Sequence, residues 1–138
     1  MENRFACLAT LIALGSAAPA AAQVKCIALP LSKASVDAGD PGARFSNAVV
    51  QARACADAEA YKLASGPAAP EEIGASVAER CKGFVEAQAR YAIAANLGWT
   101  RDEISKDRLN DLREKAAHAV KEIRAGACPV TMKPVAGR

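Results

Sequence analysis

The placement of its cysteines constrains this chain more than any other feature. The 138 residues include five cysteines, and Cys7 lies in an N-terminal segment that we expect to be removed. The four that remain are Cys26, Cys55, Cys81 and Cys128. An even set of cysteines in an oxidising compartment is typical of disulfides, and no Cys-x-x-Cys motif points to redox or metal chemistry instead. The sequence therefore predicts a small fold that brings these four residues together in two pairs.

Residues 1–22 have the features of a secretory signal peptide. Arg4 precedes an apolar run over 5–14 that is too short to span a bilayer. An alanine tripeptide then supplies the small residues that signal peptidase accepts before Gln23. We expect a mature chain of one domain that is periplasmic or secreted and makes no stable membrane insertion once the leader is removed.

The charge pattern argues against a nucleic-acid partner. The chain has 18 basic and 15 acidic residues, a net charge of +3, and only 4% aromatic residues. Nucleic-acid surfaces instead cluster Lys and Arg and interleave them with stacking aromatics. We expect no nucleic-acid partner.

Helix start and stop signals divide the chain after residue 39. Alanine, the strongest helix former, is abundant there. Asp40-Pro41 is typical of a helix start and Gly66-Pro67 of a helix end, and Pro70 begins a second segment. Gly98 ends that segment, and Thr100 opens a Thr-x-x-Glu capping box for a third. These signals predict helices over about 41–65, 70–97 and 101–125.

Each predicted helix carries an apolar face at helical spacing. The members are Phe45, Val49, Ala52, Ala56 and Leu63 in the first helix, Ile73, Val77, Phe84, Tyr91 and Ala95 in the second, and Leu109, Leu112, Ala116, Ala119, Val120 and Ile123 in the third. Short connections require consecutive helices to run antiparallel. We expect an all-α fold, an antiparallel up-down-up three-helix bundle over 40–128, with an extended N-terminal arm over 23–39 and a flexible C-terminal tail over 129–138.

The predicted bundle selects one of the three possible cysteine pairings. Residues equidistant from an antiparallel turn lie side by side, and Cys55 and Cys81 are equidistant from the middle of the first connection. Cys81 and Cys128 would lie roughly 16 Å apart along the bundle, from the rise of an α-helix. We therefore predict the disulfides Cys55–Cys81 and Cys26–Cys128, and we interpret Gly83 as a close helix contact beside Cys81.

No catalytic motif is recognisable, so we expect neither an enzyme nor a cofactor. The chain lacks a nucleophile elbow, a phosphate-binding glycine loop and a second histidine. His118 lies one helical turn from Glu114 and from Glu122, so the three could form a surface metal site. We favour a charged helix surface, because a metal site needs more convergent ligands.

Two segments could bind a partner, and the kind of partner we expect is another exported protein. Trp99 and Arg101 lie together at the second predicted turn, and both residue types are common interface anchors. The arm over 23–39 carries several aliphatic residues around Pro30. Packing within the fold is the simpler interpretation of both, and no ligand follows from these residues.

The segment over about 50–85 resembles a known family. Cys55, a gap containing proline and glycine, and then Cys81-Lys82-Gly83-Phe84 are similar to the Tai family of small exported helical immunity proteins. That family neutralises peptidoglycan-cleaving effectors of type VI secretion. The chain lacks the family's central Cys-Pro segment and adds Cys26. Our leading hypothesis is a non-enzymatic exported helical protein that works by binding. The alternatives are a periplasmic immunity protein that inhibits a cell-wall hydrolase and a small secreted metal-dependent protein using His118.

Overall fold

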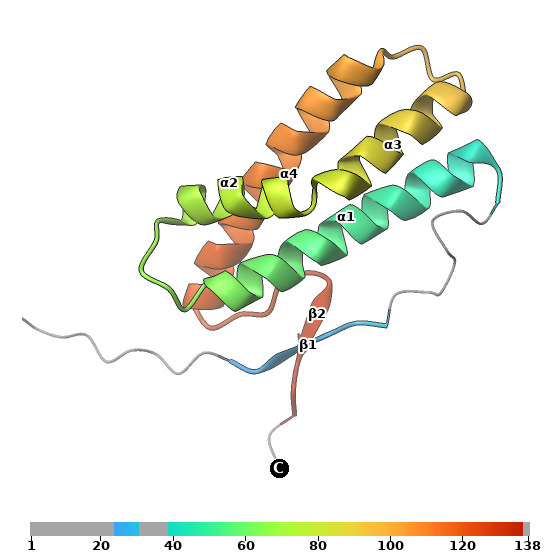
Figure 1. Cartoon of the computed structure of the whole chain (residues 1–138). Helices are drawn as coiled ribbons and strands as arrows, with labels where there is room; N and C mark the ends of the chain where they lie inside the picture. The colour runs from blue at the N-terminus through green and yellow to red at the C-terminus, as the bar shows by residue number, and fades with distance from the viewer. Residues whose placement is uncertain (1–23, 31–38, 137–138) are drawn as a thin grey trace, which may run out of the picture.

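The computed structural model describes residues 24–30 and 39–136 and is mostly helical (Figure 1). Its elements are, in chain order, β1 (Cys26–Ala28), α1 (Pro41–Leu63), α2 (Pro70–Arg80), α3 (Lys82–Ala94), α4 (Arg101–Arg124) and β2 (Met132–Pro134). The predicted leader over 1–22 lies outside the described residues, as do 31–38 of the predicted arm. Within the described part, four helices and one two-stranded sheet replace the expected three-helix, all-α bundle.

The first predicted helix is confirmed, with an end two residues earlier than expected. Asp40 caps α1, because its Oδ1 accepts a hydrogen bond from the backbone N–H of Ala43 at 2.9 Å. Hydrogen bonds from the last residue of α4 hold the loop after α1. The guanidinium of Arg124 donates to the carbonyl oxygens of Ala64, Gly66 and Ala68 at 2.7 to 2.9 Å. One side chain of α4 therefore fixes the turn between α1 and α2.

The prediction of one continuous helix over 70–97 is wrong, because the chain bends at Cys81. Cys81 has φ −94° and ψ 6°, which separates α2 from α3. The two helices then pack on different neighbours, α2 mainly on α4 and α3 mainly on α1. The disulfide from Cys81 to α1 holds the chain at the bend. A straight helix could not reach both neighbours in this way.

The bend also changes which side chains are buried after it. The predicted core residues Phe84, Tyr91 and Ala95 are only partly buried. Val85 and Ala92 lie inside instead, with 0% and 1% exposure. Ile73 and Val77 of α2 are buried as predicted, and so are all predicted residues of α4 except Leu109, which is partly buried. In α1 the predicted Ala52 and Ala56 are buried, whereas Phe45, Val49 and Leu63 are only partly buried.

The close helix contact is at Gly74 and not, as predicted, at Gly83. A Cβ atom at Gly83 would meet no atom within 4 Å, and this residue is exposed. A Cβ atom at Gly74 would lie 2.5 Å from the carbonyl oxygen of Arg113 and 3.1 Å from the Cβ of Ala117. Gly74 therefore permits the approach of α2 to α4.

Small side chains fill most of the core. The main cluster of buried residues consists of Ala52, Ala56, Ala60, Ala64, Ile73, Val77, Cys81, Val85, Leu112, Ala116, Ala119, Val120 and Ile123. Both predicted disulfides are present. Cys55 joins Cys81 with a Cα separation of 6.0 Å, and Cys26 joins Cys128 with a separation of 5.8 Å. Disulfides persist in oxidising compartments, so this pair indicates a protein that works outside the reducing cytoplasm.

The prediction of a flexible tail over 129–138 is wrong for its described part. Residues 132–134 form β2, which pairs antiparallel with β1 so that Ile27 faces Lys133. The buried carboxylate of Asp57 anchors this segment to α1, because its Oδ2 accepts from the backbone N–H and the Oγ1 of Thr131 at 3.0 and 2.9 Å. The tail is ordered because a disulfide, a carboxylate and a strand partner all hold it.

Candidate functional site

The turn between α3 and α4 positions the single tryptophan. Gly98 has φ +76°, a conformation that favours glycine, and Thr100 then caps α4. Thr100 Oγ1 accepts from the backbone N–H of Glu103, and the Glu103 carboxylate accepts from the backbone N–H of Thr100 at 3.0 Å. The predicted capping box is therefore confirmed. It fixes the backbone beside Trp99, whose exposed fraction is 51%.

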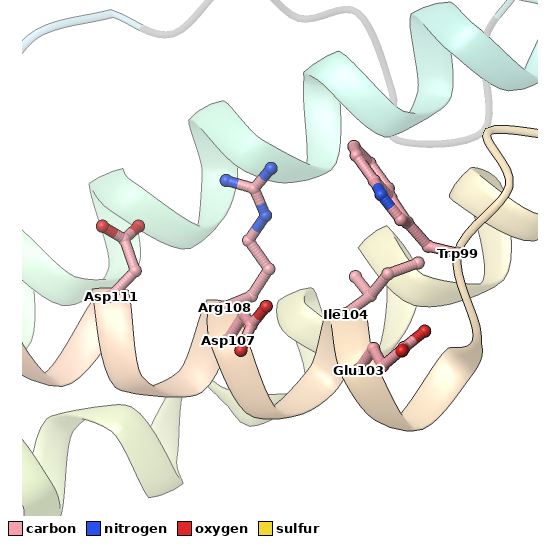
Figure 2. Close-up of a pocket in the computed structure, with 6 residues that line it drawn as sticks. All are labelled: Trp99, Glu103, Ile104, Asp107, Arg108 and Asp111. Carbon is pink, nitrogen blue, oxygen red and sulfur yellow. The ribbon is translucent and has the colours of Figure 1, made fainter.

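A pocket of about 280 Å³ opens beside Trp99 along α4 (Figure 2). It is lined by Trp99, Glu103, Ile104, Asp107, Arg108 and Asp111. Five of the six residues come from α4 at spacings of three to four, so one helix supplies most of the wall. We call this surface the Trp99 pocket.

Arg108 extends from α4 toward α1 in this pocket (Figure 2). Its guanidinium carbon lies 5.7 Å from the centroid of the Phe45 ring of α1, which is the distance of a cation–π contact. Among the described residues, Arg108 forms no ion pair. The positive charge of Arg108 is therefore held against an aromatic face and stays available beside the pocket.

The acidic side chains of the pocket differ in their partners. Thr100 donates hydrogen bonds to the Glu103 carboxylate from its hydroxyl and from its backbone N–H, and together they hold the pKa of Glu103 below its ordinary value. Asp111 pairs with Lys115 at 2.7 Å. Asp107 makes no ion pair within the described part of the chain. The pocket thus combines an aromatic ring, a guanidinium and carboxylates, which suit the recognition of a polar, charged surface.

Only one of the two predicted binding residues lines the pocket. Trp99 does, whereas Arg101 is exposed on the first turn of α4 and is not part of the lining. The sequence reasoning missed Arg108, although its spacing from Ile104 places both on one helix face. What identifies Arg108 is its contact with Phe45, which depends on the packing of α4 against α1.

The alternative metal site at His118 does not assemble. His118 Nε2 lies 3.4 Å from Glu122 Oε1, but Glu114 does not join them. In residues 24–30 and 39–136, no group of three His, Cys, Asp or Glu side chains could hold a metal ion. Spacing along one helix face brought His118 and Glu122 together, and no neighbouring element within the described residues supplies a third ligand.

Comparison with known proteins adds no relative. No protein-family model, no curated protein and no solved structure matches the chain. Across the described residues, the helices lack the combination of length and apolarity that crossing a membrane requires.

Proposed function

We propose that this protein is exported and acts without catalysis, by binding another exported protein through the Trp99 pocket. The sequence of residues 1–22 supports export, and the two disulfides agree with an oxidising compartment. The periplasm is the destination if the cell has an outer membrane.

The observation that carries this proposal is the half-exposed ring of Trp99 beside an arginine. Trp and Arg, together with Tyr, are enriched among the residues that contribute most of the binding energy at protein interfaces. The capping box already fixes the turn that carries Trp99, so binding has little backbone order to impose. The fixed ring of Trp99 and the guanidinium of Arg108, which has no ion pair among the described residues, give this pocket two anchors for a partner.

The first partner to test is a cell-wall hydrolase encoded beside this chain, because the segment 50–85 resembles the Tai immunity proteins. The two cysteines that carry this resemblance, Cys55 and Cys81, form a disulfide with each other. If the proposal is correct, the exported chain inhibits the hydrolase and protects cells that express it in the periplasm.

The single tryptophan gives a direct measurement of binding. A chain labelled with 5-fluorotryptophan has one fluorine resonance, and adding the hydrolase should shift it. Replacing Trp99 by Ala should weaken binding at least tenfold by calorimetry. Val50, equally exposed at 51% on α1, provides the control, and Val50→Ala should leave affinity unchanged. An unshifted resonance, or full protection by Trp99→Ala, would contradict the proposed role of the pocket.

A further inference from the structure

The paired strands carry an exposed face that the proposed function does not use. We call residues 25–29 and 131–135 the β1–β2 ribbon. Hydrogen bonds from Val135 N to Lys25 O and from Leu29 N to Thr131 O, both 2.8 Å, extend the pairing by one residue at each end. In Figure 1 the two strands lie together beside α1, outside the layer of helices.

The alternation of side chains defines the outward face. Residues opposite each other in an antiparallel pair project from the same face, so Ile27 and Lys133 share a face with Lys25 and Val135. Cys26 projects from the other face and is 8% exposed, with its sulfur bonded to Cys128. The face opposite Cys26 is therefore turned to solvent.

Ala28 and Pro134 on the Cys26 face are exposed as well, but the larger exposed side chains of the ribbon lie on the opposite face. Ile27 and Val135 are 47% and 45% exposed, and Lys25 and Lys133 are also exposed. The apolar surface continues at the end of the ribbon, where Leu29 and Val130 are exposed. This face has no covering element among the described residues.

The edges of the ribbon offer few backbone donors to a further strand. On β1, the backbone N–H of Cys26 donates to the Tyr61 hydroxyl at 3.1 Å, and this hydroxyl donates to the carbonyl oxygen of Val24 at 2.9 Å. On β2, the N–H of Met132 donates to Pro129, and Pro134 has no N–H. A partner that adds a strand would find few donors, so a partner must contact the face.

The chemistry of the face distinguishes among possible partners. Segments 24–30 and 127–136 contain no acidic residue, so the charge of the face comes from its two lysines. A second copy of this chain would place lysine against lysine, which is unfavourable. Protein interfaces are enriched in Tyr, Trp and Arg and depleted in Lys. A face of aliphatic side chains and flexible lysines fits an anionic lipid surface better, since lysine stems lie on apolar surface while the ammonium groups reach phosphates.

We infer that the β1–β2 ribbon docks reversibly on an anionic lipid bilayer. Lys25 and Lys133 contact the phosphate headgroups, and Ile27, Leu29 and Val135 enter the interfacial layer without crossing it. This inference is independent of the proposed function, because it uses a different surface from the Trp99 pocket. It would keep the protein at a membrane while the pocket remains free for a partner.

Vesicle co-sedimentation of the exported chain tests the inference. The chain should sediment with vesicles of phosphatidylglycerol and phosphatidylethanolamine, and not with vesicles of phosphatidylcholine alone. Replacing Lys25 and Lys133 together by Gln should weaken binding about thirtyfold, because each lysine near an anionic bilayer contributes roughly fivefold. Replacing Ile27 and Val135 together by Ser should weaken it about tenfold or more.

A matched variant distinguishes binding through the ribbon lysines from binding through positive charge elsewhere on the surface. Arg101→Gln with Lys106→Gln removes the same charge from exposed positions on α4 and should leave vesicle binding unchanged. Circular dichroism checks that every variant is folded. Equal losses in the α4 and lysine variants, or undiminished binding by the Ile27 and Val135 variant, would overturn the inference. Binding to polyglutamate without binding to anionic vesicles would also overturn it and point to an acidic protein.

Discussion

Asp57 is the residue on which the C-terminal segment depends. Its side chain is fully buried, and its Oδ1 lies 2.9 Å from Arg53 Nε in an ion pair that is not aligned as a hydrogen bond. Its Oδ2 accepts both hydrogen bonds from Thr131. In sequence Asp57 is one more polar residue in an alanine-rich helix, so periodicity could not identify it. Its partner Thr131 is far along the chain, and only the folded structure brings the two together.

We expect Asp57→Ala to lower the free energy of unfolding by about 3 kcal/mol, because it leaves a partly buried guanidinium and the Thr131 donors unpaired. Urea denaturation followed by circular dichroism measures the change. Asp111→Ala is the control, since Asp111 pairs with Lys115 at the surface, where a pair contributes at most about 1 kcal/mol. Similar losses in the two variants would mean that the buried carboxylate has no special role.

Glu59 makes stability depend on pH. Hydrogen bonds from Lys62 and from Arg80 hold the pKa of Glu59 below its ordinary value of 4.5. The folded protein therefore keeps this carboxylate ionised at a pH where the unfolded chain has taken up a proton. Its contribution to stability is present above the unfolded pKa and is lost as the pH falls through the folded pKa.

The expected result is a smaller loss of stability on acidification in Glu59→Gln than in the wild type. Melting temperatures recorded between neutral pH and pH values below 4.5 test this directly. If the two proteins lose stability in parallel over that range, the ion pairs of Glu59 with Lys62 and Arg80 do not contribute to folding.

At the scale of elements, sequence signals located helix ends better than helix contacts. The starts at Pro41, Pro70 and Arg101 follow from proline and capping residues, which act within one turn. The bend at Cys81 has no proline or glycine at its position to announce it. It depends on a disulfide and on two packing partners, so it follows from the tertiary structure. For the same reason, the sequence placed the close contact at Gly83 and missed Gly74.

Gly74 and Gly83 form a matched pair for testing the contact between α2 and α4. Gly74→Ala should lower the free energy of unfolding by about 2 kcal/mol, because its Cβ would overlap the backbone of Arg113. Gly83→Ala should be neutral or stabilise the protein by up to about 1 kcal/mol, because the site is open and alanine favours helix. Thermal unfolding gives both values. A stable Gly74→Ala variant would show that α2 can move away from α4 at little cost.

At the scale of the whole molecule, two cross-links fasten a core built largely from alanine. The disulfide pairing was predictable because Cys55 and Cys81 lie at similar distances from the connection between α1 and α2. Cys26 and Cys128 then remained to pair with each other. The strand pairing of the chain ends was not predictable, since each strand has three residues and no alternating pattern of its own. The Trp99 pocket was found only in part, because Arg108 is recognised through its contact with Phe45.

Replacing both cysteines of a disulfide by Ser should lower the free energy of unfolding by a different amount for each of the two disulfides. The bridges close segments of 102 and 26 residues, so the loop-entropy model gives losses of about 4.7 kcal/mol for Cys26–Cys128 and about 3.5 kcal/mol for Cys55–Cys81. Urea denaturation of the two double variants measures the difference. A larger loss for the Cys55–Cys81 variant would mean that the bridge at the bend stabilises the native packing beyond its effect on the unfolded chain.

The pairing of β1 with β2 also limits the order in which parts of the molecule can fold. β1 is synthesised well before β2, since Cys26 of β1 and Cys128, which precedes β2, are 102 positions apart. A nascent chain can form α1 and α2 early, but the strand pair and the disulfide to Cys128 must wait until residues 128–134 have been synthesised. Until then neither β1 nor Cys26 has its partner, so this strand pair and this disulfide cannot guide the folding of α1 and α2.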